Sequence, residues 1–222
     1  MSSKEAGTNF LLVRHGETDW NVERRLQGHT DIALNARGLE QAAQTAQALR
    51  FENVQRVVSS DLQRARQTAQ AVLDALTPAS ALPPLQLEIS LRERHFGVLQ
   101  GRSAHELQCS DEPLARIWHE RQVDAVLTGG ESLAVFHARV VEVLERLATQ
   151  HAGETVVLVA HGGVLDSMYR HIRGLPLHTA REWLLPNAAI HRVSHHPQRG
   201  WQVLAWADER HLKAARDEVD AA

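Results

Sequence analysis

The chain has 222 residues, of which 43% are hydrophobic and 23% charged, a composition typical of folded globular proteins and not of disordered ones. The formal net charge of -3 argues against a generally basic, nucleic-acid-binding protein. Because the sequence contains a single cysteine, Cys109, no intrachain disulfide can form, and we expect no dependence on an oxidising compartment.

The first half of the chain alternates short apolar runs with amphipathic stretches, which is typical of α/β proteins. In chain order, the pattern predicts a strand at 10–13, a helix at 36–50, a strand at 54–59, a helix at 61–76 and a short strand at 85–89. Asn35 is expected to cap the first helix, and Leu39 and Leu49 to lie on its inward face. A proline-rich run at 78–84 interrupts the pattern.

The second half continues the alternation after an irregular stretch. It predicts a helix near 113–122, a long helix at 131–150, a strand at 155–160, a helix at 164–172 and a hairpin of strands at 190–195 and 201–207. Because we find no repeat and no low-complexity linker, we expect residues 1–222 to form a single domain. Residues 1–8 are expected to be a flexible N-terminus, and residues 208–222 a charged tail that forms a loose helix.

The order of these elements predicts a three-layer α/β fold, in which a mostly parallel central sheet carries helices on both faces. The N-terminus lacks the apolar stretch of a signal peptide, and no apolar run is long enough to span a bilayer. We therefore expect a cytoplasmic protein that engages neither membranes nor nucleic acids.

Three of the expected strands end in residues that suit phosphate chemistry. Arg14 and His15 follow the first strand, Arg64 lies one turn into the helix after the second, and His161 follows the strand at 155–160. Parallel strands place their carboxyl ends at one edge of the sheet, so these side chains should converge there.

This combination of side chains matches the needs of phosphoryl transfer. Two guanidinium groups suit a tetrahedral dianion, and a neutral imidazole such as that of His15 can attack phosphorus. A second histidine, His161, can donate to the non-bridging oxygens during transfer. The leaving alkoxide also needs a proton, so a carboxylic acid should lie near.

Five stretches occur in a fixed order along nearly the whole chain. They are 12–18 (LVRHGET), followed by Trp20-Asn21 and Gln27-Gly28, then 59–65 (SSDLQRA), 91–97 (LRERHFG), 129–132 (GGES) and 159–163 (VAHGG). This ordered set closely resembles the motifs of the histidine phosphatase superfamily, also called the phosphoglycerate mutase-like family. The resemblance implies the phosphoglycerate mutase-like fold, and it implies an enzyme that needs neither a metal nor an organic cofactor.

The resemblance also implies roles for individual residues. His15 would become the phosphohistidine, and Arg14, Arg64 and His161 would form the phosphate pocket. Glu93 would be the general acid and then the base that activates water. The residues at family positions that line the pocket are Asn21, Gln27, Gly28 and Gly162. Fourteen histidines also raise a metal hypothesis, but none show a compact ligand spacing, so we expect no metal site.

The family contains both phosphatases and phosphoglycerate mutases, and the sequence bears on this choice. Arg94 could hold a substrate carboxylate, which favours a phosphoglycerate-type ligand. Ala104, however, stands where the cofactor-dependent mutases carry a lysine, and 117–122 lacks their adjacent arginine pair. The short segment that leads to 129–132 is similar to that of the broad-specificity phosphatases.

We therefore expect a phosphomonoester hydrolase of the histidine acid phosphatase type, whose partner is a small phosphorylated metabolite. The first alternative is a phosphoglycerate mutase. The second is a noncatalytic module that binds a phospho-ligand, although such a module would normally lack a core residue, and all five core residues are present. The natural substrate stays open, and so does a homodimer, the assembly common in the family.

Overall fold

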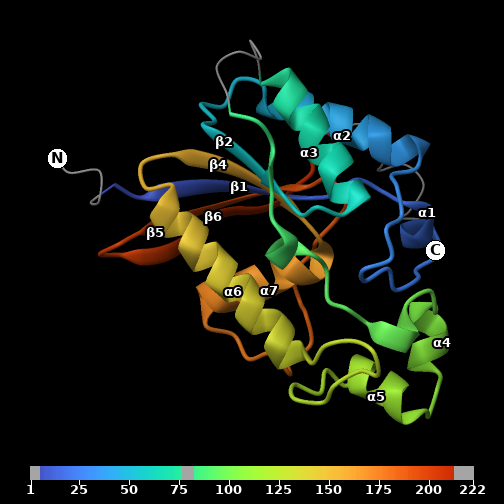
Figure 1. The fold of residues 1–222 in the computed structure, drawn as a ribbon. Coiled ribbons are helices and arrows are strands. Elements are labelled where there is room, and N and C mark those ends of the chain that lie inside the picture. Colours follow the sequence, from blue (N-terminus) through green and yellow to red (C-terminus); the bar gives the residue numbers. More distant parts are fainter. Residues whose placement is uncertain (1–5, 77–82, 213–222) are drawn as a thin grey trace.

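The computed structural model describes residues 6–76 and 83–212, and its middle layer is a six-stranded sheet in the order β3-β2-β4-β1-β5-β6 (Figure 1). The strands are β1 (Thr8–Arg14), β2 (Arg56–Ser59), β3 (Gln86–Leu87), β4 (Thr155–Ala160), β5 (Ile190–His196) and β6 (Gly200–Asp208). The pairs β1–β4, β2–β4 and β2–β3 are parallel, and β5 and β6 join antiparallel at one side. The expected mostly parallel sheet is therefore confirmed.

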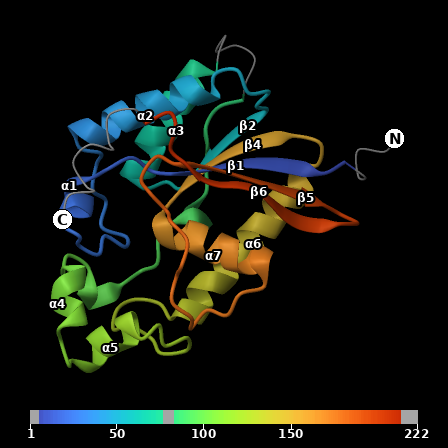
Figure 2. The same ribbon diagram turned by 180° about the vertical axis from the view of Figure 1, so that it is seen from behind.

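Helices cover both faces of the sheet, as the two opposite views in Figures 1 and 2 show. One face carries α2 (Ala36–Leu49) and α3 (Gln63–Ala75), and the other carries α6 (Leu133–Gln150) and α7 (Gly162–Arg173). This arrangement confirms the expected three-layer α/β fold.

The central strands are apolar on both faces because each face meets a helix layer. On β1, Phe10 and Leu12 pack into the cluster under α6 and α7, whereas Leu11 and Val13 pack into the cluster under α2 and α3. The alternation follows from the period of two in a strand. It explains why the sequence shows a continuous apolar run in place of an alternating one.

Helix starts differ from the expected ones at three places. Helix α3 begins at Gln63, two residues after the expected start. The Ser132 side chain accepts a hydrogen bond from the backbone N–H of Val135, so α6 begins at Leu133 and Glu131 lies before the helix. Helix α7 begins at Gly162, two residues before the expected start, because the chain turns directly after His161. Asn35 does cap α2, by accepting from the backbone N–H of Gly38.

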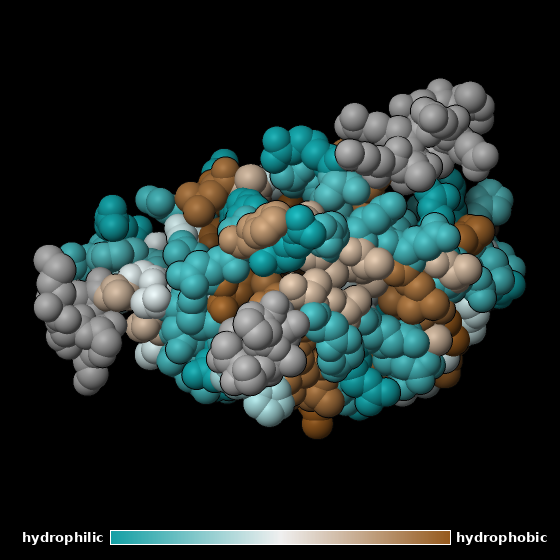
Figure 3. All heavy atoms as spheres, turned by 90° about the horizontal axis from the view of Figure 1, so that it is seen from above, coloured by the Kyte–Doolittle hydropathy of each residue, from teal (hydrophilic) through white to brown (hydrophobic). Residues whose placement is uncertain are grey.

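The outward face of α2 includes Leu39, which is 52% exposed, so its expected place on the inward face is wrong. Seen from above, the surface is mainly hydrophilic, with hydrophobic residues in small groups between hydrophilic ones (Figure 3). Among the described residues, none of the helices has the length and apolar character that crossing a membrane requires.

Short elements connect β3 to α6, and all but the first of them, η2, pack around a small cluster of their own beside the sheet. They are the 3-10 turns η2 (Ile89–Leu91) and η3 (Gly97–Leu99) and the helices α4 (Ala104–Gln108) and α5 (Pro113–His119). The small cluster consists of Leu99, Leu107, Ala115 and Leu127. A further short helix, α1 (Asp19–Val22), follows β1. In Figure 1, α4 and α5 lie below the sheet, apart from the helix layers.

Both ends of the described chain correct an expectation. Thr8 belongs to β1, is buried, and donates through Oγ1 to the carbonyl of Ala148 at 2.7 Å, so it is not part of a flexible terminus. Strand β6 extends to Asp208, and Leu212 is buried, so no helix forms over 208–212. The rest of the expected N-terminal and C-terminal segments, 1–5 and 213–222, lies outside the described residues, as does most of the proline-rich run, 77–82.

Candidate active site

The carboxyl ends of β1, β2 and β4 meet at one edge of the sheet. Arg14 pairs with Ala160 in the β1–β4 register, and the backbone N–H of His15 donates to the carbonyl of Ala160 at 3.0 Å. The rings of His15 and His161 lie 5.2 Å apart between their centroids. Arg64, in the first turn of α3, lines the same cavity as His15. The expected convergence of these residues is confirmed.

His15 is held in one tautomer by the backbone. Its side chain is buried, and Nδ1 lies 2.7 Å from the carbonyl oxygen of Gly16. Because a carbonyl oxygen only accepts, Nδ1 must carry the hydrogen, and Nε2 keeps the lone pair. Burial, followed by the positive charges of Arg64 and Arg14, lowers the pKa of His15 well below 6.5. The ring is therefore neutral at neutral pH, with a lone pair on Nε2.

Arg14 and Arg64 offer buried donors that no atom of the described residues uses. Arg64 donates from Nη1 to the carbonyl of Thr30 and from Nη2 to that of Gly28, each at 2.9 Å, and Arg14 donates from Nη1 to the carbonyl of Leu185. The Nε atom of each arginine is buried without a partner. Desolvation lowers the pKa of each guanidinium to about 10, so both remain charged at neutral pH. Unpaired buried N–H groups are costly and fit a bound anion.

His161 is the fourth member of this cluster. Its Nε2 lies 2.8 Å from Ser60 Oγ, and its Nδ1 is buried without a partner. Burial, together with Arg64, His15 and Arg14, lowers the pKa of His161 well below 6.5. Helix α7 begins at the next residue, Gly162, so its N-terminal end adds a positive dipole beside the cluster.

Glu93 is fixed by two backbone N–H groups. Its Oε1 accepts from the N–H of Arg94 and its Oε2 from the N–H of Gly163, both at 2.9 Å. A Cβ atom at Gly163 would lie 2.2 Å from Glu93 Oε1, so only glycine leaves room for the carboxyl group there. The start of α7 therefore contributes to both the anion cluster and the position of the carboxyl group.

Glu93 stands between two adjoining cavities. The first, of about 220 Å³, contains His15, Arg14 and Arg64. The second, of about 130 Å³, is lined by Arg94, Arg121 and the aromatic side chains of Trp118 and Phe136, among others. Glu93, Phe96 and Gly163 line both cavities. A phosphate ester with its phosphorus near His15 thus has a second space for its leaving group.

The residues that the resemblance assigned to substrate binding do not all line the same cavity. Asn21, Gln27 and Gly162 line the first cavity, as expected. Gly28 is not among the residues that line these two cavities, and its carbonyl accepts from Nη2 of Arg64 at 2.9 Å, so its expected role in substrate binding stays a prediction. Arg94 lines only the second cavity, and desolvation lowers the pKa of its guanidinium to about 10.

The sequence reasoning missed several residues of this site. Arg25 and Arg181 line the first cavity, and Arg181 comes from the irregular chain after α7, where no motif marks it. Asn187 donates from Nδ2 to the carbonyl of His15 at 2.9 Å, and the N–H of Ala188 donates to that of Arg14 at 3.0 Å. No local pattern announces these contacts, because they join chain segments more than 170 residues apart.

Within 6–76 and 83–212, no group of three or more histidine, cysteine, aspartate or glutamate side chains lies close enough together to hold a metal ion.

A sequence model of the histidine phosphatase superfamily (branch 1) matches residues 10–209. The chain is 35% identical over 206 residues to phosphoglycerate mutase-like protein 4 of Arabidopsis thaliana. This match covers 92% of this chain and 86% of the relative.

Two solved structures are similar in fold. The α-ribazole phosphatase of Shigella flexneri matches with a TM-score of 0.78 and 27% identity, over 90% of this chain and 96% of that one. The phosphoserine phosphatase of Entamoeba histolytica in complex with 3-phosphoglyceric acid matches with a TM-score of 0.80 and 26% identity, over 92% of this chain and 99% of that one.

Proposed function

The chain belongs to the histidine phosphatase superfamily, and we propose that it is a phosphatase that hydrolyses small phosphate monoesters through a phosphohistidine at His15. One observation carries the proposal. Around the neutral imidazole of His15, three buried nitrogen atoms have no partner within 6–76 and 83–212: Nε of Arg14, Nε of Arg64 and Nδ1 of His161. This is the donor set that a phosphoryl group with three equatorial oxygens needs.

In the first step, Nε2 of His15 attacks the phosphorus of the bound ester. A P–N bond forms while the bond between phosphorus and the leaving oxygen breaks. The carboxyl group of Glu93 gives its proton to that oxygen, so the alcohol leaves neutral. Arg14 and Arg64 stabilise the charge on the equatorial oxygens, because both are charged and already desolvated.

In the second step, water replaces the alcohol. The Glu93 carboxylate takes a proton from this water as its oxygen attacks phosphorus, and the P–N bond breaks. Inorganic phosphate leaves, and His15 returns to its neutral state with Glu93 protonated. One carboxyl group serves as acid and then as base because it stands between the two cavities, at the boundary between phosphoryl group and leaving group.

The second cavity supports a small leaving group that carries a negative charge. Arg94 donates from Nε and Nη2 to the carbonyl of Glu131, and it lines the cavity together with Arg121. Arg121 pairs with Asp166, at 3.0 Å from Nη2 to Oδ2, so Arg94 is the cation that we assign to the substrate. Phe96, Trp118 and Phe136 supply apolar surface beside these two cations. We propose that a carboxylate of the substrate binds there, as in a phosphoglycerate-type ester.

A phosphoglycerate mutase is the second candidate, and one structural observation favours it. Arg25 and Arg181 add two cations to the first cavity that the sequence reasoning did not include, and they would help to retain a doubly phosphorylated intermediate. Against it, Ala104 begins α4 and lines neither cavity, so that position supplies no cation. We therefore keep water as the proposed acceptor.

Parallel assays with a panel of monophosphate esters and with 3-phosphoglycerate separate the two candidates. A phosphatase releases inorganic phosphate in proportion to ester consumed, and acid-labile phosphate appears on the protein during turnover. Formation of 2-phosphoglycerate with little free phosphate would instead establish the mutase. Binding of phosphate esters without either product would leave a noncatalytic module.

A further inference from the structure

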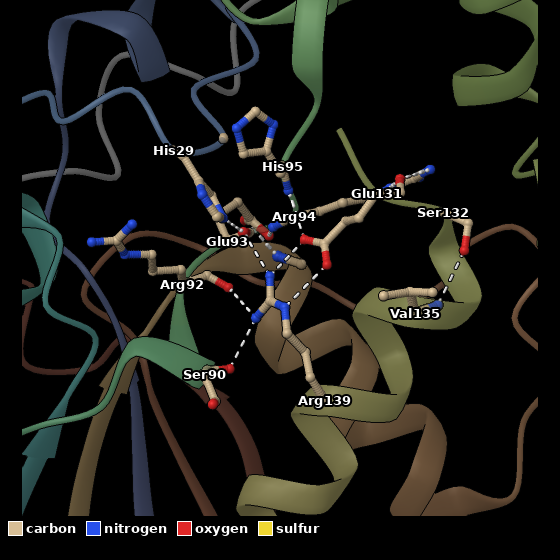
Figure 4. Close-up of polar contacts among 12 residues, drawn as sticks. His29, Ser90, Arg92, Glu93, Arg94, His95, Glu131, Ser132, Val135 and Arg139 are labelled. Carbon is tan, nitrogen blue, oxygen red and sulfur yellow. Dashed lines mark hydrogen bonds and ion pairs between the residues drawn. The ribbon is translucent and has the colours of Figure 1, made fainter. Parts of the chain in front are cut away.

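Glu131, just before α6, and Arg139, in the first two turns of α6, form an ion pair that contacts the chain carrying Glu93 (Figure 4). Arg139 donates from Nε to Glu131 Oε2 at 3.1 Å and from Nη2 to Glu131 Oε1 at 2.6 Å. The side chains are 22% and 14% exposed. This bidentate geometry fixes the guanidinium plane of Arg139, and its other N–H groups then point in set directions.

The remaining N–H groups of Arg139 bind three backbone carbonyls around the proton donor. Nη1 donates to the carbonyls of Ser90 and Arg92, at 2.9 and 2.8 Å, and Nη2 donates to that of Glu93 at 3.0 Å. Figure 4 shows Arg139 reaching from α6 to these carbonyls. Ser90 lies in η2 and the chain after η2 is irregular, so no regular helix or strand pairs the carbonyls of Arg92 and Glu93. The Glu93 carbonyl also lies 2.9 Å from Nε2 of His29.

Glu131 fixes the chain on the other side of Glu93. Its Oε1 accepts from the backbone N–H of His95 at 2.8 Å, and its carbonyl accepts from Nε and Nη2 of Arg94 at 3.2 and 3.1 Å. The Arg139–Glu131 pair therefore holds backbone atoms from Ser90 to His95. The N–H of Arg94, which binds the Glu93 carboxyl group, lies inside this stretch.

The pair also lies where the 97–130 segment leaves and rejoins the main body. The N–H of Glu131 donates to the carbonyl of His95 at 3.0 Å. A Cβ atom at Gly130 would lie 2.3 Å from the same carbonyl, so the two chains cross in close contact. Because the segment between them supplies Trp118 and Arg121 to the second cavity, the pair links the wall of that cavity to the proton donor.

We propose that Arg139, together with Glu131, is a positioning residue that holds the carboxyl group of Glu93 at the leaving oxygen. The proposal rests on the proposed role of Glu93 in phosphoryl transfer. Among the residues that the structure describes, the Glu93 side chain accepts from two backbone N–H groups, those of Arg94 and Gly163, so its place follows the backbone that the pair fixes. Without the pair, the proton is delivered from the wrong position.

The test compares two substrates that differ in their need for a proton. An alkyl phosphate needs protonation of its leaving oxygen, whereas an aryl phosphate such as p-nitrophenyl phosphate leaves as a stable anion. We expect Arg139→Met to lower kcat for the alkyl ester by about 100-fold, within the usual range for general acid catalysis, and for the aryl ester by less than about 3-fold. KM should change little for both esters. Arg139→Lys keeps the charge but not the planar set of donors, so its kcat for the alkyl ester should lie between those of the wild type and Arg139→Met.

Arg146→Met provides the matched control. Arg146 lies on the same helix and pairs with Glu88 at the surface, but it makes no contact with the backbone around Glu93. It should leave the ratio of the two rates unchanged. Thermal unfolding of each variant checks that the fold is intact.

Two outcomes would overturn the proposal in distinguishable ways. If the wild-type protein cleaves both esters and folded Arg139→Met loses the same factor on each, the pair is structural and does not position the acid. If the wild-type protein transfers phosphate to His15 from neither ester, as read by acid-labile phosphate in a single turnover, the proposed function fails and this inference fails with it.

Discussion

At the scale of single residues, burial strengthens the neutral state of the imidazole but leaves the guanidinium groups charged. Burial lowers the pKa of His15, so the nucleophile is neutral without a separate base. The same burial lowers the pKa of Arg14 and Arg64 only to about 10, which leaves both cations intact. A neutral nucleophile and charged anion ligands can therefore share one desolvated cavity over a wide range of pH.

Replacing the nucleophile gives the first prediction. His15→Ala should abolish turnover and remove acid-labile phosphate from the protein, because the variant lacks the nitrogen that accepts the phosphoryl group. Phosphate should still bind, since Arg14, Arg64 and His161 remain. Turnover and trapped phosphate are measured with the same ester, and binding of inorganic phosphate by calorimetry. Labelled phosphate that persists on the variant would identify a different nucleophile.

Replacing the proton donor gives the second prediction. Glu93→Gln keeps a side chain of similar size but has no proton to give to a leaving oxygen. We expect kcat/KM to fall by roughly 100-fold to 10,000-fold for alkyl phosphates and much less for aryl phosphates, because only the alkyl esters need the proton. A plot of rate against leaving-group pKa should steepen in the variant. Parallel plots for the variant and the wild type would contradict the role of Glu93.

The sequence identified the residues of this cluster that follow strands within motifs, namely Arg14, His15, Arg64 and His161. It could not identify Arg181 or Asn187, which reach the site from irregular chain near the C-terminus. It also could not show that the carbonyl of Gly28 binds Arg64, because a glycine in a motif does not reveal which way its carbonyl faces. Such contacts depend on how distant segments pack, and no local pattern encodes them.

At the scale of elements, α2 fixes the chain that follows the nucleophile. The carbonyl of Glu17 accepts from the N–H of Asn35 at 3.0 Å, and the N–H of Glu17 donates to Gln41 Oε1 at 2.8 Å. Two glycines allow this approach. A Cβ atom at Gly16 would lie 2.4 Å from the carbonyl oxygen of Gly38, and one at Gly38 would lie 2.0 Å from that of Glu17.

This contact gives the third prediction. Gly38→Ala should destabilise the protein by about 1 to 3 kcal/mol, because the added methyl group forces the first turn of α2 away from Glu17. Alanine favours a helix over glycine by only about 1 kcal/mol, so the clash dominates. The displaced loop should also lower kcat/KM. Denaturant unfolding and turnover are measured beside Glu40→Ala, an exposed site on the same helix, which should change neither. A Gly38→Ala protein as stable and active as the wild type would refute the tight contact.

Hydrophobic periodicity in the sequence predicted the long helices, but it did not predict the short ones. The long helices α2, α3 and α6 each bury one face, so their apolar spacing is visible in the sequence. Helices α1 and α4 have four and five residues, too few to show a period. These short helices are marked by capping boxes, formed by Thr18 with Asn21 and by Ser103 with Glu106. Hydrophobic periodicity does not reveal a capping box.

At the scale of the whole molecule, the fold buries several histidines in their neutral form. His15 and His161 lie in the site, and His191 lies on β5 opposite Leu12. The ring centroids of His191 and Trp206 are 4.1 Å apart. Burial, followed by the charge of Arg14, lowers the pKa of His191 from 6.5 to about 3. Nδ1 of His191 accepts from the N–H of Ala207 at 3.0 Å, which fixes the neutral tautomer.

These histidines make stability depend on pH with a definite sign. Above pH 6.5 they are neutral in both the folded and the unfolded state, so they add no pH dependence. As the pH falls below 6.5, they take up protons in the unfolded state but stay neutral in the folded state, where the pKa of each is lower. The unfolded state then binds more protons, and the free energy of unfolding falls by up to about 1.4 kcal/mol per pH unit for each histidine.

The fourth prediction isolates one of these contributions. His191→Asn keeps an acceptor for the N–H of Ala207 but removes the titrating ring. The variant should be less stable at pH 7, because it loses packing against Trp206, yet its stability should fall less steeply with acid. Below pH 6.5, we expect the slope of unfolding free energy against pH to decrease by up to about 1.4 kcal/mol per unit.

Urea unfolding at several pH values between 7 and 5 measures this slope, with His119→Asn, an exposed site on α5, as the control. An unchanged slope in His191→Asn would show that His191 takes up its proton in the folded state, and that its burial does not drive the acid sensitivity of the fold.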